Sequence, residues 1–144
     1  MAISTVLGSC VSVCIFDRKR KRGGMNHFRF PVTRDREQAT AFYGNAATLA
    51  LVAMMLDSGS KTKDLVAQIV GGAHNLEISS EDIGRENVRI ARKVLVGKKI
   101  RVISEDIGGT QGRKVVYNTA NNELAVLKVD TIRKGDWGPY IGDR

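Results

Sequence analysis

Residues 5–31 read TVLGSCVSVCIFDRKRKRGGMNHFRFP, and this segment predicts a β-hairpin near the start of the chain. Residues 11–16 alternate in the period-two pattern of a strand and are rich in β-branched side chains. A basic run at residues 18–22 ends this strand, and residues 23–30 resume an extended pattern. We therefore expect two neighbouring strands joined by a positively charged turn.

The rest of the chain contains both helix-like and strand-like segments. Apolar residues recur at helical spacing over 42–56 and 88–95, and a glycine follows each run, Gly59 and Gly97. Strands are expected at residues 65–70, 100–103, 115–117 and 124–129, with Asn121 and Asn122 as turn residues between the last two. The pattern predicts one α/β domain over residues 1–130, with helices packed on a mixed sheet, and an extended arm over 131–144.

The length and composition of the chain indicate which class of protein to expect. The chain has 144 residues with 42% hydrophobic and 26% charged, which fits a single soluble domain. No apolar run approaches the roughly 20 residues of a membrane span. The N-terminus lacks the layout of a secretory signal, so we expect a cytoplasmic protein with free thiols.

A formal charge of +8 favours acidic partners without choosing among nucleic acid, membrane and protein. The sequence lacks the usual features of nucleic-acid-binding proteins. It has no zinc-ligand spacing, no aromatic RNP-like strand and no basic helix with heptads. The basic residues are mostly in turns rather than on an amphipathic helix, which disfavours binding to a membrane surface.

The hairpin brings a thiol and an imidazole into register. If Asp17 pairs with Arg20 across a two-residue loop, Cys10 lies directly opposite His27. Directly opposite residues have Cβ atoms about 4.5–5.5 Å apart on one face of a sheet. A slip of one residue would move the two side chains to opposite faces.

Such a pair suits nucleophilic catalysis, because an imidazole can take the proton of a thiol to leave a thiolate. The small residues of the Gly8-Ser9 turn allow backbone N–H groups to bind an oxyanion. The alternative is purely structural, since Cys is among the most buried residue types.

Six short motifs occur in order along the chain. They are LGSCVSVCIFD at 7–17, GGMNHFRFP at 23–31, Tyr43-Gly44, VGGA at 70–73, IGREN at 83–87, and EDIGG at 105–109 with Gly112-Arg113. In this order and spacing the sequence resembles the CheD family of bacterial chemoreceptor glutamine deamidases, from about residue 4 to residue 129.

The resemblance implies a cytoplasmic enzyme that converts selected glutamines of chemotaxis receptors to glutamate, and a partner, the CheC phosphatase. The family's catalytic Cys and His correspond to Cys10 and His27. Its third residue is a Thr six positions before the Cys, where this chain has Ser4. Serine keeps the hydroxyl, and Thr5 could serve after a shift of one residue.

The expected chemistry is amide hydrolysis through a thioester. Cys10 attacks the carboxamide carbon, His27 protonates the leaving ammonia and then activates water, and Ser4 orients the imidazole. We expect neither a cofactor nor a metal, because two Cys and two His in this arrangement do not resemble a zinc site.

Other chemically capable residues have simpler interpretations. Cys14, four positions along the same strand face, is expected to be a buried packing residue. His74 is an alternative base that could line a cleft. The pairs Gly71-Gly72 and Gly108-Gly109 are expected to form turns that could shape a substrate groove, and Glu105 and Asp106 to be solvated or loop-capping.

Two rival functions remain open at this point. One is a non-catalytic docking partner of the phosphatase, which the departure at Ser4 favours. The other is a basic nucleic-acid-binding domain, favoured by the net charge and by residues 18–22.

Overall fold

The computed structural model describes residues 1–32, 42–78 and 80–130. In chain order its elements are β1 (Ala2–Leu7), β2 (Val11–Asp17), β3 (Arg22–Met25), α1 (Gly44–Asp57), a short 3₁₀ helix (Thr62–Asp64), β4 (Leu65–Gly71), α2 (Ile83–Gly97), β5 (Arg101–Ile107), β6 (Gly112–Asn118) and β7 (Glu123–Val129). The predicted α/β class is confirmed. The predicted arm over residues 131–144 lies outside the described residues.

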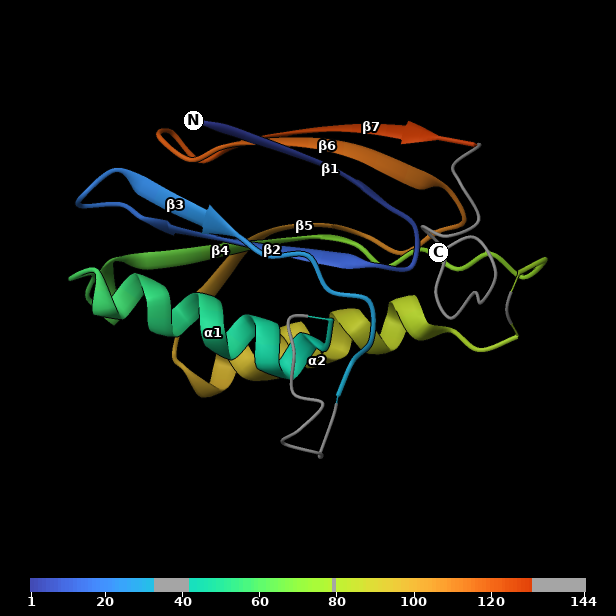
Figure 1. Ribbon diagram of the computed structural model, residues 1–144, viewed down its shortest axis with the longest axis horizontal. Helices are drawn as coiled ribbons and strands as arrows, with labels where there is room; N and C mark the ends of the chain where they lie inside the picture. The colour runs from blue at the N-terminus through green and yellow to red at the C-terminus, as the bar shows by residue number, and fades with distance from the viewer. Residues whose placement is uncertain (33–41, 79, 131–144) are drawn as a thin grey trace.

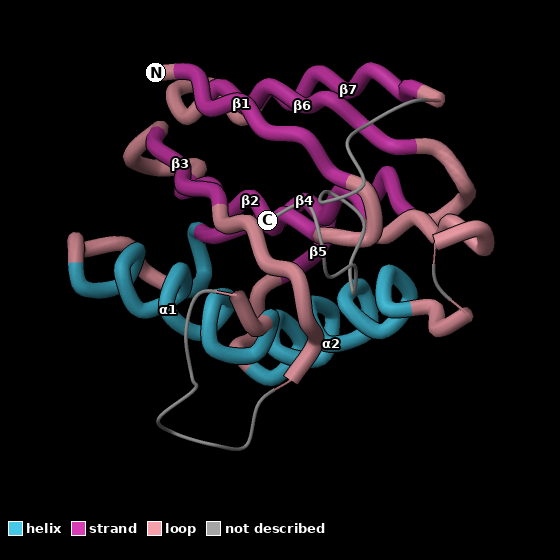
Figure 2. Tube along the Cα trace, turned by 45° about the vertical axis from the view of Figure 1, so that its right-hand side comes forward, coloured by secondary structure: helices cyan, strands magenta, loops and turns pink. Residues whose placement is uncertain are grey.

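The elements form three layers, as Figure 1 shows. A three-stranded sheet has the order β1-β6-β7, and a four-stranded sheet below it has the order β3-β2-β4-β5. The parallel pair β4 and β5 is connected through α2, and the other neighbours run antiparallel. Helices α1 and α2 lie together on the far side of the four-stranded sheet (Figure 2). The strands are thus divided between two sheets.

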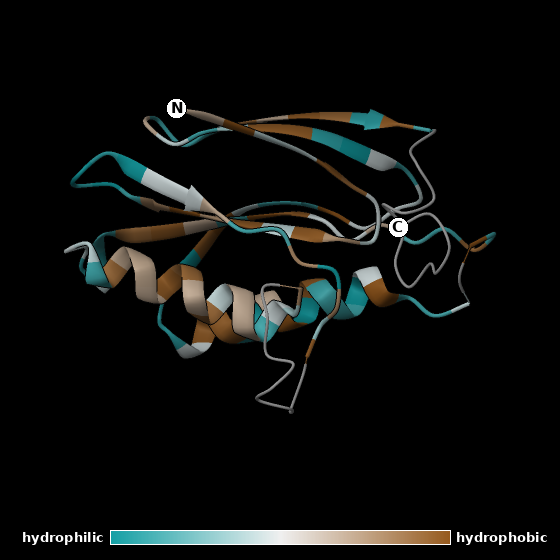
Figure 3. Ribbon diagram, viewed as in Figure 1, coloured by the Kyte–Doolittle hydropathy of each residue, from teal (hydrophilic) through white to brown (hydrophobic). Residues whose placement is uncertain are grey.

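Strand β2 is buried along its whole length because it lies between the helices and the three-stranded sheet. Val11, Val13 and Ile15 belong to the core that the helices share. Side chains alternate along a strand, so Ser12 and Cys14 face the three-stranded sheet. Hydropathy follows this arrangement in Figure 3, where β4 is mostly hydrophobic and the β2–β3 turn is hydrophilic. Ser12 and Cys14, which follow Cys10 along the chain, therefore lie in the layer between the two sheets.

The predicted register of the hairpin is wrong by two residues. Asp17 pairs with Arg22 rather than with Arg20, so the loop has four residues, 18–21. The cause is the Asp17 carboxylate, whose Oδ1 accepts the backbone N–H groups of Lys19 at 2.9 Å and Arg20 at 3.0 Å. Lys21 adopts a positive φ of 56° to close the turn, and its N–H donates to the Asp17 carbonyl at 2.9 Å.

Two other boundaries differ from the sequence prediction. Strand β1 was not predicted; it forms by pairing antiparallel with β6, which lies far away in the chain. Helix α2 begins at Ile83 rather than at residue 88, because the Asp82 carboxylate caps it by accepting the Arg85 N–H at 3.0 Å. After Ile83 the first turn of α2 consists of Gly84, Arg85 and Glu86, so apolar spacing alone could not locate its start.

Helix α1 carries no charged side chain before Asp57. Its inner face packs on the four-stranded sheet through residues such as Leu51 and Val52. Leu49 and Met54 are exposed on its outer face. Neither α1 nor another helix in the described ranges is long and apolar enough to cross a membrane.

Candidate active site

The loop between β1 and β2 holds Cys10 in a fixed, buried position. The residue is 1% exposed and packs with Leu7, Val70 and Val115 in the layer between the two sheets. These neighbours come from three strands, β1, β4 and β6. The thiol-bearing residue therefore lies where both sheets meet, and not on the helical side of the molecule.

Hydrogen bonds fix the backbone of this loop through three successive carbonyl groups. The Gly8 carbonyl accepts the Ala73 N–H at 3.0 Å, and the Cys10 carbonyl accepts the Gly72 N–H at 2.9 Å. The Ser9 carbonyl between them accepts Nδ2 of Asn87 at 2.9 Å. The glycine pair that the sequence suggested as a groove-shaping turn thus lies directly against the Cys10 loop.

Only glycine fits at position 71, where β4 meets the Cys10 loop. Gly71 has a φ of +110°, and a Cβ atom there would collide with the Cys10 carbonyl oxygen. Gly72 also has a positive φ, +73°, and its missing side chain leaves room for Gly84 of α2. These glycines therefore permit the close approach of β4, the Cys10 loop and α2.

His27 lies after β3, on the segment that returns toward the Cys10 loop. Its neighbour Phe28 exchanges two backbone hydrogen bonds with Val11, at 2.9 and 3.0 Å, and packs in the helical core. Alternation then directs His27 toward the three-stranded sheet. There Nδ1 of His27 forms a 2.8 Å hydrogen bond with Oγ1 of Thr5 on β1.

Ser4, which the sequence suggested as the residue that orients His27, does not face the imidazole. Ser4 and Thr5 are adjacent on β1, so their side chains point to opposite faces of the sheet. Ser4 is exposed, whereas Thr5 is partly buried and faces His27. Of the two hydroxyl residues considered from the sequence, the structure brings Thr5 to the imidazole.

The observed register changes the relation between Cys10 and His27. The predicted direct opposition is wrong, because the pairs Cys14–Met25 and Val11–Phe28 place Ser12 opposite His27 and Arg29 opposite Cys10. The shift is of two residues, so both side chains stay on one face. Cys10 and His27 become diagonal neighbours, which in a regular antiparallel pair have Cα atoms about 7–8 Å apart.

Cys14 is the packing residue that the sequence predicted. It is fully buried on β2 and sits opposite Met25 and Gln68 of the two neighbouring strands. Burial raises the pKa of its thiol to about 12. A thiol with this pKa is protonated at neutral pH, so Cys14 is a poor nucleophile there. Neither Cys10 nor Cys14 forms a disulfide bond.

His74 lies at a separate cavity of about 220 Å³, which α2 and the turn after β5 line together. Nδ1 of His74 is 3.8 Å from Oδ2 of Asp82, and its backbone N–H donates to the Gly109 carbonyl at 2.9 Å. Arg92, another lining residue, forms a two-point ion pair with Glu105 at 2.7 and 3.0 Å. The imidazole of His74 is therefore placed at this cavity and not at the Thr5–His27 pair.

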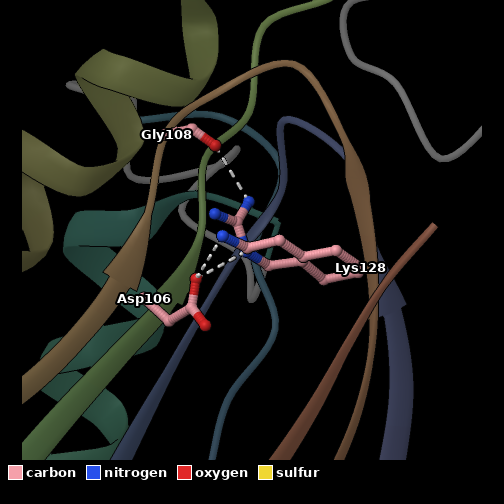
Figure 4. Close-up of polar contacts among 4 residues, drawn as sticks. Asp106, Gly108 and Lys128 are labelled. Atoms are coloured by element: carbon pink, nitrogen blue, oxygen red, sulfur yellow. Dashed lines mark hydrogen bonds and ion pairs between the residues drawn. The ribbon is translucent and has the colours of Figure 1, made fainter. Parts of the chain in front are cut away.

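Arg113, which the sequence showed only as part of a motif, is buried and supports the same turn. Arg113 of β6 is 2% exposed; its Nε lies 3.1 Å from Oδ1 of Asp106, and its Nη1 donates to the Gly108 carbonyl at 3.0 Å (Figure 4). Lys128 of β7 adds a weaker contact to Asp106 at 3.8 Å. Asp106 is thus paired rather than merely solvated. The position of Asp106 just before Gly108-Gly109 is visible in the sequence. Its pairing with Arg113 is not.

The described residues contain no group of three or more His, Cys, Asp or Glu side chains arranged to hold a metal ion.

Comparisons with known proteins identify the family. The family model described as CheD chemotactic sensory transduction matches residues 30–128. Three similar proteins are all named probable chemoreceptor glutamine deamidase CheD. The one from Trichlorobacter lovleyi is 42% identical over 119 residues, covering 81% of this chain and 74% of the relative. The one from Sulfurimonas denitrificans is 38% identical, covering 88% and 82%, and the one from Rhodospirillum rubrum is 37% identical, covering 99% and 83%. The chain belongs to the CheD family.

Proposed function

We propose that this protein is a chemoreceptor glutamine deamidase, which hydrolyses glutamine side-chain amides of chemotaxis receptors to glutamate. The names of its relatives support the substrate and the reaction. The observation that carries the proposal is the 2.8 Å hydrogen bond between Thr5 and His27. Side-chain alternation in the register of Val11 with Phe28 supports a shared sheet face for His27 and Cys10. This arrangement supplies a nucleophile, a base and a group that orients the base.

In the proposed mechanism, Thr5 sets the tautomer of His27. When Nδ1 of His27 donates its proton to Oγ1 of Thr5, Nε2 keeps a lone pair that can accept a proton. Nε2 then takes the proton of the Cys10 thiol. The resulting thiolate is stabilised by the imidazolium beside it, which a buried thiolate requires.

The thiolate of Cys10 attacks the carboxamide carbon of the substrate, forming a C–S bond while the carbonyl electrons move to oxygen. His27 gives its proton to the amide nitrogen, the C–N bond breaks, and ammonia leaves a thioester. A water molecule then gives a proton to His27 and attacks the thioester carbon. The C–S bond breaks, Cys10 is regenerated, and the substrate side chain becomes a glutamate.

We assign the oxyanion site to the backbone of the Cys10 loop. In a trans peptide the N–H group points away from the preceding carbonyl. The carbonyls of Gly8 and Ser9 are directed toward Ala73 and Asn87, so the N–H groups of Ser9 and Cys10 point the other way. Donors fixed before the reaction stabilise a developing oxyanion without reorganisation.

The proposed setting is the cytoplasm, where both thiols would stay reduced. We also propose that a CheC phosphatase binds this protein, on the basis of family membership. Sedimentation of the purified protein with a CheC phosphatase tests that part separately, because a protein that deamidates receptors without binding CheC would refute only the partner.

The rival hypothesis of a non-catalytic docking protein loses its main support. It rested on the serine at position 4, and Thr5 supplies the hydroxyl that the imidazole requires. The direct experiment is mass spectrometry of a receptor fragment after incubation with the protein. The proposal expects specific glutamines to gain the mass difference between an amide and a carboxyl group, and an unchanged fragment would refute it.

A further inference from the structure

Asn87 of α2 connects the two segments that carry Cys10 and His27. Its side chain is fully buried. Nδ2 donates one hydrogen bond to the Ser9 carbonyl and a second to the Arg29 carbonyl, each at 2.9 Å. Ser9 directly precedes Cys10, and Arg29 follows His27 by two residues. One amide group therefore touches the backbone beside both proposed catalytic residues.

The chemistry of the partners fixes how this amide is oriented. Both partners are carbonyl oxygens, which only accept hydrogen bonds, so the amide must present its NH₂ group to them. The other end of the amide, Oδ1 of Asn87, is buried and accepts no hydrogen bond from the described residues. The geometry thus uses Asn87 as a double donor, at the cost of a buried acceptor.

The bridge lies where backbone pairing between the two segments ends. Val11 and Phe28 form the last backbone pair before the Cys10 loop. One position further, Cys10 and Arg29 would face each other in the same register. Here Asn87 links the Ser9 and Arg29 carbonyls from the side of the helices. The amide therefore continues the connection beyond the last rung of the ladder.

Glycine at position 84 lets α2 come close enough for this bridge. Gly84 and Asn87 lie three residues apart and share a helix face. A Cβ atom on Gly84 would collide with the carbonyl oxygens of Gly72 and Ala73. The same two residues donate their N–H groups to the Cys10 and Gly8 carbonyls. The first turns of α2 are therefore packed directly beneath the loop that carries the thiol.

We propose that Asn87 is a positioning residue, which holds the peptide before Cys10 and the strand after His27 in the mutual placement that lets the imidazole take the thiol proton. The proposal rests on the proposed deamidase function. Fixing the Ser9 carbonyl also fixes the peptide plane that leads into Cys10, and with it the direction of the Cys10 N–H. A misplacement of about 1 Å at a reacting pair can lower a rate by on the order of 100-fold.

The chain offers a matched control for testing Asn87. Gln68 is 8% exposed, and its Nε2 donates to two oxygens of Asn122 at 2.9 and 3.0 Å. Asn87→Leu and Gln68→Met each keep the approximate size of the side chain and remove two hydrogen bonds donated by a side-chain NH₂ group. Asn87→Leu leaves the Ser9 and Arg29 carbonyls without this donor, whereas in Gln68→Met the Oδ1 atom of Asn122 still accepts the Tyr117 hydroxyl at 2.8 Å. Urea unfolding measures what each variant loses in stability, and only Asn87→Leu should also change the active site.

Two readouts separate positioning from a structural role. With a receptor fragment as substrate, Asn87→Leu should lower kcat by about 10- to 100-fold with little change in KM, and Gln68→Met should keep both. The midpoint pH for alkylation of Cys10 by iodoacetamide should be higher in Asn87→Leu than in the wild type, as we also expect for His27→Ala, and should be unchanged in Gln68→Met. Equal losses of kcat in the two variants, or an unshifted alkylation profile in Asn87→Leu, would overturn the proposal.

The same experiment distinguishes this proposal from the deamidase assignment. Alkylation needs no substrate, so a shifted profile in a protein that deamidates nothing would refute the function and keep the positioning role. If Asn87→Leu does not fold, Asn87→Ser serves instead, because its hydroxyl keeps a single donor. Asn87→Ser should give an intermediate kcat and an intermediate alkylation midpoint, and wild-type values of both would refute the role of Asn87.

Discussion

Thr5 and His27 join the two sheets of this protein through one hydrogen bond, 2.8 Å long, between Oγ1 and Nδ1. Thr5 belongs to β1 of the three-stranded sheet, and His27 follows β3 of the four-stranded sheet. The imidazole is therefore oriented by a strand that is not part of its own sheet.

Replacing Thr5 with Val should lower kcat for deamidation by about 10- to 100-fold, less than the loss of the base itself, because a hydroxyl that orients an imidazole contributes less than proton transfer. Thr5→Ser should retain most of the activity, since it keeps the hydroxyl. Ser4→Ala is the matched control, because Ser4 is exposed on the opposite face of β1. A large loss in Ser4→Ala with none in Thr5→Val would contradict the assignment.

Cys14 should make stability depend on alkaline pH. Burial raises the pKa of its thiol from 9.0 to about 12 in the folded protein. The folded protein therefore holds a proton that the unfolded chain releases, and the free energy of unfolding should fall as pH rises from about 9 to 12, by up to about 1.4 kcal/mol per pH unit for one group. Urea unfolding at several pH values measures this slope. Cys14→Ala should fall less steeply than the wild type, and an equal slope would refute the cause.

The basic β2–β3 turn should affect receptor encounter and not the chemical step. β2 is seven residues long, so the turn lies about 23 Å from the start of the strand, next to Cys10. Arg18 and Arg20 also hold backbone carbonyls of Lys63 and Ser58, so the cleaner change is Lys19→Ser with Lys21→Asn. Asparagine tolerates the positive φ at position 21.

For this double variant we expect an unchanged kcat and a raised KM at low salt, with the difference disappearing at high salt. Steady-state kinetics at two ionic strengths provides the measurement. A large drop in kcat at saturating receptor would mean that the turn lies near the chemistry and that the observed register is incorrect.

The contacts of Asp106 should differ greatly in importance. Arg113→Met removes a buried guanidinium that bonds both Asp106 and the Gly108 carbonyl, and should cost about 1–3 kcal/mol of unfolding free energy. Lys128→Met removes a contact of 3.8 Å from a side chain that is 52% exposed, and should cost less than about 0.5 kcal/mol. Urea unfolding of the pair compares them directly, and equal costs would contradict the role of Arg113 as the buried support.

The sequence predicted the elements better than the connections between them. The strands β2 and β4 and the helix α1 were found because their apolar patterns are strong and long. The hairpin loop was predicted two residues too short because Asp17 uses its side chain to build the turn, which a count of strand residues does not reveal. The error preserved the face shared by Cys10 and His27, since a strand repeats every two residues.

Local sequence patterns could not identify residues whose role depends on contacts with residues far away in the chain. Thr5 was one of two hydroxyl candidates, and only the pairing of β1 with β6 decides which of them faces His27. Asn87 was noticed as part of a family motif, but its partners, Ser9 and Arg29, are far away in the chain. The buried state of Arg113 likewise depends on Asp106 and on the stacking of the two sheets.

The most direct test of the account compares the wild type with Cys10→Ala, His27→Ala and Cys14→Ala in one mass-spectrometric assay on a receptor fragment. The wild type and Cys14→Ala should convert the same glutamines to glutamate, while Cys10→Ala and His27→Ala should slow conversion by at least about 1,000-fold and remain folded by circular dichroism. Conversion by Cys10→Ala at the wild-type rate, or its loss in a well-folded Cys14→Ala, would contradict the assignment of Cys10 as the nucleophile.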